Sequence, residues 1–459
     1  MEYLLSILAY AALFFLVLAV FRRICRRRAP ARVIPQPIIE ISDAAVTRRA
    51  LVEYADAFSN RPMSMFRIPI VKGHRRRRSD NIISVPYGPL WRTLRCNLAA
   101  ETIHPTRYAS YAPLRRAAID DIVASVQSAA SKGRAVVVRD GLYAAVFSMI
   151  ARMCFGDGLV DEADVRAMQC EFREFILAAV ESTSTCESKL LGYWRRRQRD
   201  PIALRRRLAE LFLPLIEEAR RQSSRFCDGK ARSYVDSLIH LRIPDEDDDN
   251  DEHLRRALRE DEMVSLVLEF LGAGTETVVA CVEWTLAHLV TRPEIQKKLR
   301  REAIINIKYD GDNKYPSEDE EREILHRGMA PYLHAVVLES LRMHPPTPFV
   351  MRDIRAEGGV VGQTAMPAGG LRTSSWGTSG GTPRHGRIPT SSGRRGRRYC
   401  PGMALGMLNV KCLLAALVRE FEWSEGNSGV DLTELDGFFK AMKKPLRARV
   451  TPHTCVQHV

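Results

Sequence analysis

The sequence predicts a mainly helical fold with small β-sheets, an α+β protein preceded by one membrane-spanning helix. Apolar residues recur at helical spacing through residues 107–225, through residues 261–292 and through Met403–Phe421. Strand patterns are short and few, and the clearest are Ile38–Ile41 and Val430–Leu432 with Pro445–Val450, the last two read as a closing hairpin. Long apolar helices therefore supply the core, and the strands are accessory.

The N-terminal stretch has the features of a membrane anchor. Tyr3–Phe21 carries no charge, is rich in Leu, Ala, Phe and Val, and is long enough to span a bilayer as a helix. Arginines at positions 22, 23, 26, 27 and 28 follow directly, whereas a cleavable signal would carry its charge before the apolar run. The positive-inside rule then places the rest of the chain in the cytoplasm. We expect residues 1–21 to form a transmembrane signal anchor and residues 22–37 a basic stop and short hinge.

Cysteine usage and net charge narrow the class of protein. The ten cysteines form no C-x-x-C pair, which argues against a zinc site and against a disulfide scaffold and fits a reducing compartment. The net charge of +14 suggests a membrane surface, an acidic partner or nucleic acid as a binding partner. Because the arginine clusters are scattered and no nucleic-acid-binding motif accompanies them, we expect no nucleic-acid binding.

One cysteine, Cys400, lies in a basic, glycine-rich loop that leads into an apolar helical pattern. A thiolate needs positive charge or hydrogen-bond donors nearby, and here Arg398 and the N–H groups at the start of the following helix supply both. Gly402 and Gly406 are four residues apart and leave one helix face without side chains, against which a planar group can lie. The pattern indicates a metal-ligating thiolate beside a flat cofactor, with an ordinary cysteine in an arginine-rich loop as the alternative.

A second informative place is the helical pattern that begins near Pro89. Trp91 and Arg95 are four residues apart and therefore share one helix face. An indole N–H and a guanidinium on one face suit a buried carboxylate. The alternative is a surface helix anchored by its tryptophan.

The centre of the long pattern at residues 261–292 reads Gly272-Ala273-Gly274-Thr275-Glu276-Thr277. Each glycine inside a helix costs about 1 kcal/mol relative to alanine, so a packing or functional reason is required. A local widening of the helix would make room for a small ligand and would present the Thr277 hydroxyl to it. A glycine-containing core helix is the alternative.

Taken in order, these patterns resemble the motifs of the cytochrome P450 monooxygenases: W-x-x-x-R, A-G-x-D/E-T, E-x-x-R and G-x-R-x-C-x-G. The resemblance implies a cytochrome P450-like fold over residues 38–459 that binds haem b. It also implies that Cys400 is the axial thiolate ligand of the iron and that Arg398, Trp91 and Arg95 contact the haem propionates.

The resemblance implies roles for two further residue pairs. Glu276 and Thr277 would relay the protons that splitting of dioxygen consumes in a dry site. Glu339 and Arg342 would form a buried ion pair that locks the core and takes no part in the reaction. The expected reaction inserts one oxygen atom into a small apolar molecule, with electrons from an NADPH-dependent reductase. Plant microsomal members of the A-type clan are the nearest likeness, which implies a single-pass protein of the endoplasmic reticulum membrane with a cytosolic catalytic domain.

Residues 371–393 depart from the family pattern. Residues 371–392 show neither helical nor strand spacing, a composition typical of a disordered loop. The family has Phe seven residues before the cysteine, and this chain has Gly393. We hypothesise that this segment was read out of frame or across a wrong splice, and that part of the N-terminal sheet was lost similarly. An inactive or haem-free membrane-anchored remnant is therefore an alternative, as is a hydrolase with Cys400 as nucleophile, which has no local signature.

Overall fold

The computed structural model describes residues 38–41, 43–61, 81–183, 201–223, 233–245, 255–306, 330–347, 349–354, 359–361, 364–366, 369–374, 397–427, 429–435 and 439–453. The chain divides into two compact units, residues 1–39 and residues 40–459. The predicted anchor and hinge at residues 1–37, and most of the atypical segment at residues 371–393, lie outside the described residues.

Helices make up most of the described chain, which confirms the mainly helical prediction. They are α2 (Ala44–Arg48), α3 (Pro89–Asn97), α4 (Ala112–Ser131), α5 (Val138–Phe155), α6 (Glu162–Thr183), α8 (Pro201–Ser223), α9 (Tyr234–His240), α10 (Glu260–Val290), α11 (Pro293–Asn306), α13 (Pro331–Met343) and α14 (Met403–Glu420). Short π-helical turns continue α2 and α3, over Arg49–Glu53 and Leu98–Thr102 respectively.

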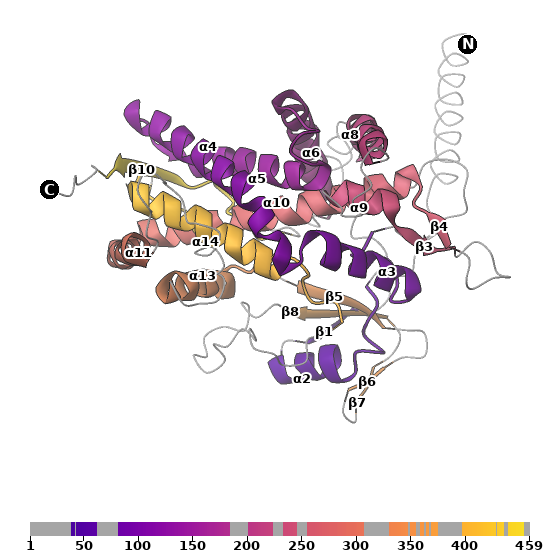
Figure 1. The fold of residues 1–459 in the computed structure, drawn as a ribbon. Helices are drawn as coiled ribbons and strands as arrows, with labels where there is room; N and C mark the ends of the chain where they lie inside the picture. The colour runs from indigo at the N-terminus through magenta and orange to yellow at the C-terminus, as the bar shows by residue number, and fades with distance from the viewer. Residues whose placement is uncertain are drawn as a thin grey trace, which may run out of the picture. The chain divides into compact units, whose positions relative to one another are not determined.

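The helix α10 is the centre of the second unit, and α5 lies between α4 and α10 (Figure 1). It begins after Arg259, whose backbone N–H donates to the Glu262 carboxylate at 2.7 Å, and Glu260, Asp261 and Glu262 place negative charge in its first turn. Within the described part of the chain it is the one helix long and apolar enough to cross a bilayer, but most of its apolar stretch is buried among other helices. Its composition is therefore that of a core helix.

The two glycines of α10 have a packing reason. A Cβ atom at Gly272 would lie 3.1 Å from Cζ of Phe172 on α6, and one at Gly274 would lie 3.0 Å from Cγ2 of Ile150 on α5. Both distances are shorter than ordinary carbon contacts, so glycine allows the three helices to approach closely. The predicted local widening is wrong, because α10 is α-helical throughout Glu260–Val290.

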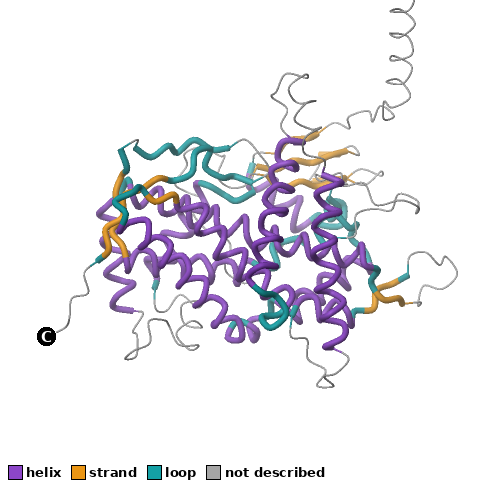
Figure 2. Tube along the Cα trace, turned by 90° about the horizontal axis from the view of Figure 1, so that it is seen from above, coloured by secondary structure: helices purple, strands orange, loops and turns teal. Residues whose placement is uncertain are grey.

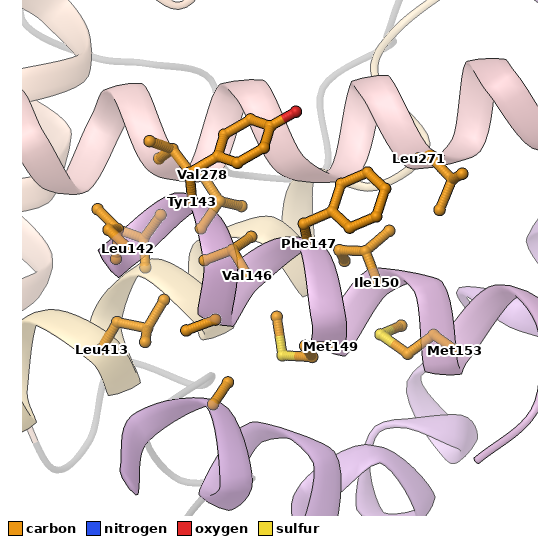
Figure 3. Packing of buried hydrophobic residues seen from close by; sticks show 14 of the residues in the cluster. Leu142, Tyr143, Val146, Phe147, Met149, Ile150, Met153, Leu271, Val278 and Leu413 are labelled. Carbon is orange, nitrogen blue, oxygen red and sulfur yellow. The ribbon is translucent and has the colours of Figure 1, made fainter. Parts of the chain in front are cut away.

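Side chains of α5 form the middle of the hydrophobic core, as Figure 3 shows. They lie between α10 on one side and α4 and α14 on the other. The residues labelled in the figure are Leu142, Tyr143, Val146, Phe147, Met149, Ile150 and Met153 of α5, Leu271 and Val278 of α10, and Leu413 of α14. Burial of this much apolar surface is the main favourable term in folding.

The strands lie at the margins of the helices (Figure 2). Two three-stranded sheets have the orders β1-β8-β5 and β2-β10-β9, and the pairs β3-β4 and β6-β7 form two-stranded sheets. The strands are β1 (Ile38–Ile41), β2 (Val136–Val137), β3 (Arg242–Pro244), β4 (Arg255–Ala257), β5 (Phe349–Ile354), β6 (Gly359–Val361), β7 (Thr364–Met366), β8 (Gly369–Ser374), β9 (Phe421–Glu425) and β10 (Arg447–Pro452). The predicted strand Ile38–Ile41 is confirmed as β1.

Two strand predictions need correction. The strand β10 pairs antiparallel with β9, from Ala448 opposite Glu425 to Pro452 opposite Phe421, and not with residues 430–432. The signal that sequence reasoning missed is the alternation of buried Phe421 and Trp423 with exposed neighbours directly after α14. The absence of strand structure from residue 371 is also wrong for its first residues, since β8 runs to Ser374 and pairs with β5.

Candidate functional site

Cys400 lies between the Arg397–Tyr399 turn and the start of α14, whose N-cap is Gly402. Its thiol is free and reaches the surface, although protein atoms surround it on most sides. This enclosure raises the pKa of the Cys400 thiol, while the Gly402 N–H group, Arg95 and Arg61 lower it. These donors favour the thiolate but do not outweigh burial, so the thiolate at Cys400 stays a prediction.

Open space borders the first turns of α14. A Cβ atom at Gly402 or at Gly406 would meet no atom within 4 Å. Tyr399 and Met403, on either side of Cys400, are large hydrophobic residues that are nearly half exposed. A bare helix face with apolar residues beside a thiol has the shape and chemistry to bind a flat apolar group.

Arg398 is buried and clamps the cysteine loop to distant segments of the chain. Its guanidinium donates to four backbone carbonyls, those of Ser59, Ile82, Ile83 and Val85, with 3.1 Å to Ile82 O and 3.2 Å to Ile83 O. Burial and the neighbouring Arg61 lower the pKa of Arg398 to about 10, against the charge of Glu269. The sequence predicted a cofactor contact for Arg398 but gave no sign of these carbonyls.

Trp91 and Arg95 share one face of α3, which begins at Pro89 as predicted. The indole Nε1 of Trp91 donates to Ile82 O at 3.2 Å, and the Arg398 guanidinium lies 5.0 Å from the Trp91 ring centroid. Arg95 NH2 donates to Tyr399 O at 2.8 Å, directly before Cys400 in the chain. The structure thus brings Trp91, Arg95 and Arg398 together beside Cys400.

Four arginines gather around this site. Arg352 is buried, and burial together with Arg61 and Arg398 lowers its pKa to about 9. Burial also lowers the pKa of Arg61, with Arg95 adding to the repulsion. In the described part of the chain, Glu269 is the carboxylate that acts on Arg61 and Arg398. A buried surplus of positive charge is unfavourable unless an anionic partner neutralises it, so the residues present fit a flat group with acidic substituents.

Glu276 and Thr277 lie at the middle of α10 and take different environments. Burial raises the pKa of Glu276 to about 7, and Arg139, Arg173 and the neighbouring Tyr143 hydroxyl counteract it. Thr277 Oγ1 donates to Ala273 O at 2.8 Å, one turn back along the same helix. Both residues belong to the described structure, and no hydrogen bond joins their side chains there.

Glu339 and Arg342 form a bidentate ion pair on α13, with Nε to Oε2 at 2.8 Å and NH2 to Oε1 at 2.7 Å. Their side chains are 54% and 45% exposed, so the predicted burial of this pair is wrong. The reason is that the buried face of α13 consists of Leu333, Val337 and Ser340, and the pair lies off that face.

Sequence reasoning missed Glu269, whose carboxylate accepts hydrogen bonds from the backbone N–H groups of Ile82 and Ile83 at 2.8 and 2.6 Å. The available signal was a charged residue inside the otherwise apolar stretch Leu266–Leu271 of α10. Buried carboxylates in apolar helices usually have specific partners.

The fold and the site define a class: mainly helical proteins in which a cysteine loop and a glycine-bearing helix leave room for a flat group with acidic substituents. The family model for cytochrome P450 matches residues 31–371. The chain therefore belongs to the cytochrome P450 family of monooxygenases, in which haem with a cysteine thiolate is implied. The match ends at the first residue of the atypical segment and before Cys400.

Known relatives and solved structures agree with this family. The chain is 29% identical over 451 residues to cytochrome P450 89A9 of Arabidopsis thaliana, covering 91% of this chain and 84% of that protein. It is 24% identical over 426 residues to amorpha-4,11-diene 12-monooxygenase of Artemisia annua, covering 87% and 81% respectively. The zebrafish cytochrome P450 structure with progesterone matches at a TM-score of 0.71 with 18% identity, covering 95% of this chain and 99% of that one.

Proposed function

We propose that the chain is a haem-dependent monooxygenase that inserts one oxygen atom of dioxygen into a small apolar molecule. The proposal depends on the Cys400 thiol, which accepts a hydrogen bond from the Gly402 N–H group at the edge of the bare face of α14. Family membership supports the same reaction class. Electrons would come from NADPH through a flavoprotein reductase.

The haem group would be held by residues of three kinds. Cys400 would ligate the iron, Gly402 and Gly406 would leave room for the macrocycle, and the buried arginines described above would neutralise its two carboxylates. When bound, haem with an axial thiolate supplies the chemistry that activates dioxygen.

The residues of α10 would manage protons in this reaction. Because burial raises its pKa to about 7, the Glu276 carboxyl can both take up and release a proton near neutral pH. The Thr277 hydroxyl donates to Ala273 O, so it has to rotate away from that carbonyl before it can pass its own proton onward.

The proposed location is the endoplasmic reticulum membrane, with a single pass through residues 1–21 and the catalytic domain in the cytosol. The uncharged run Tyr3–Phe21 and the arginines after it support this proposal. An apolar substrate is supported by the steroid named in one similar structure and by the hydrocarbon named in one similar protein, since both ligands are apolar.

A second candidate is a membrane-anchored remnant that binds no haem. Three observations favour it: the family match stops at residue 371, the Glu339–Arg342 pair is exposed, and the donors of Arg398 are occupied by backbone carbonyls. We propose that residues 371–393 arose from an out-of-frame reading or a wrong splice. Sequencing the transcript tests this, because a full-length message that encodes the same segment refutes it.

The two candidates differ in haem content and in turnover. The full chain is produced in microsomal membranes together with a plant NADPH-dependent reductase, and haem is measured per mole of chain. The monooxygenase proposal predicts about one haem per chain and dioxygen uptake that requires both NADPH and an apolar substrate. A chain that accumulates in the membrane with no haem identifies the remnant instead.

A further inference from the structure

The Ile82–Ile83 peptide group lies between two charged side chains. Its N–H group donates to Glu269 Oε1 at 2.6 Å, and its C=O group accepts from Arg398 NH1 at 3.1 Å and from Trp91 Nε1 at 3.2 Å. A peptide group is a dipole whose N–H end is positive and whose C=O end is negative. The carboxylate and the guanidinium therefore each face the end of opposite sign.

The surrounding turn makes this peptide group a firm link. Val85 N donates to Asn81 O at 2.9 Å, and the Asn81 side chain accepts from both the backbone N–H and the hydroxyl of Ser84. Glu269 also accepts from Ile82 N at 2.8 Å. Residues 81–85 therefore form a hydrogen-bonded turn, so a displacement of the turn at Glu269 also displaces the carbonyl groups that Arg398 binds.

Glu302 provides a comparison within the same chain. Its carboxylate accepts from the N–H groups of Tyr332 and Leu333 at 2.8 and 2.7 Å, the same pattern of two consecutive amides. Those amides belong to the first turn of α13, where N–H groups have no partner in their own helix. Glu302 is thus a helix cap, whereas Glu269 binds a turn that no helix follows directly.

Burial makes the arrangement at Glu269 costly, since it raises the pKa of this carboxyl to about 7 in spite of the two N–H donors and the charges of Arg61 and Arg398. A carboxylate placed in an apolar helix at such a cost needs partners that hold it in position. Here the partners are the Ile82 and Ile83 N–H groups, and Arg398, two residues before Cys400, binds the carbonyl of the same peptide group.

We propose that Glu269 is a positioning residue that couples α10 to the Cys400 loop through the Ile82–Ile83 peptide group and Arg398. This inference rests on the proposed function, because its purpose is to fix the thiol relative to the helix that carries Glu276 and Thr277. Removal of the carboxylate releases the turn at residues 81–85, Arg398 loses its fixed acceptors, and the loop at residues 397–402 loosens.

Amide hydrogen exchange followed by mass spectrometry tests this coupling on the full chain in detergent micelles. Glu269→Gln should speed exchange about tenfold in peptides that cover residues 81–86, because a charge-assisted bond is lost, and also in peptides that cover residues 397–402. The matched control Glu302→Gln should speed exchange only around residues 330–335. A Glu269→Gln chain whose residues 397–402 exchange as in the wild type overturns the proposal.

A second variant covers the case in which Glu269→Gln fails to fold, which would appear as fast exchange throughout α5. Glu269→Asp keeps the charge but is one methylene too short to reach both amides, and it should give the same two-site increase. If it folds and loosens residues 81–86 alone, the coupling is refuted. The readout needs no haem, so wild-type haem content, measured separately, shows whether the proposed function itself has failed.

Discussion

Replacement of Arg398 by lysine separates a structural role for this residue from a role in binding a cofactor. The guanidinium donates to four backbone carbonyls from two distant segments, through Nε, NH1 and NH2. A lysine keeps the charge but presents its donors from a single nitrogen atom, and it can reach only about half of these acceptors.

The expected cost follows from the acceptors that remain. Two buried carbonyls would be left without a donor, and each such loss costs about 1–3 kcal/mol, which gives about 4 kcal/mol as a central expectation. The chain has 459 residues, and the entropy of unfolding is about 2 cal/mol/K per residue, so the melting temperature should fall by about 4 °C.

Thermal unfolding of the full, haem-free chain in detergent, followed by circular dichroism, measures this shift. The matched control is Arg397→Lys, because Arg397 is the adjacent arginine and pairs with Asp56, whose side chain is 85% exposed. Such a surface change should alter stability by no more than about 0.5 kcal/mol. If both variants melt together without haem, Arg398 is not the clamp described here and its role lies only in cofactor binding.

Three further substitutions test other parts of the account. Gly274→Ala should destabilise the chain by about 1–2 kcal/mol, because the steric clash of the added methyl group with Ile150 costs more than the gain in helix propensity returns. In an Ile150→Ala background this penalty should vanish. Gly406→Ala meets open space, so it should raise the melting temperature of the haem-free chain slightly yet reduce haem uptake; unchanged uptake would show that no flat group lies on this face. Glu276→Gln tests the pKa of the Glu276 carboxyl, which burial raises from 4.5 to about 7. The stability that the wild-type carboxyl contributes is complete below pH 4.5 and is lost as the pH rises through 7. The free energy of unfolding of the wild type should therefore fall by about 3 kcal/mol relative to that of the variant between pH 4 and 8. A stability difference that does not vary with pH would contradict that shift.

Much of the helical framework could be predicted from the sequence, because long helices leave a strong periodic signal. The expected helix at residues 261–292 is α10, Glu260–Val290, and the pattern at Met403–Phe421 is α14, which ends one residue earlier. The shared face of Trp91 and Arg95 followed from their spacing alone, since α3 begins at Pro89.

The partners of the site residues could not be predicted in the same way. Arg398 and Glu269 bind backbone groups of residues 59 and 82–85, and every residue type carries such groups, so no sequence signal marks them. The exposure of Glu339 could not be predicted either, because the spacing of Glu339 and Arg342 does not indicate which face of α13 packs inward. Strand β9 was missed because its alternation extends over only Phe421–Glu425.

The reduced, carbon-monoxide-bound difference spectrum of the full chain in membranes shows whether Cys400 ligates haem iron. We expect a thiolate-type Soret band in the wild type and in Cys412→Ala, which changes a buried cysteine of α14, and no such band in Cys400→Ala. A wild-type chain that is present in the membrane but gives no thiolate-type band, or a Cys400→Ala chain that retains the band, would show that Cys400 is not the iron ligand.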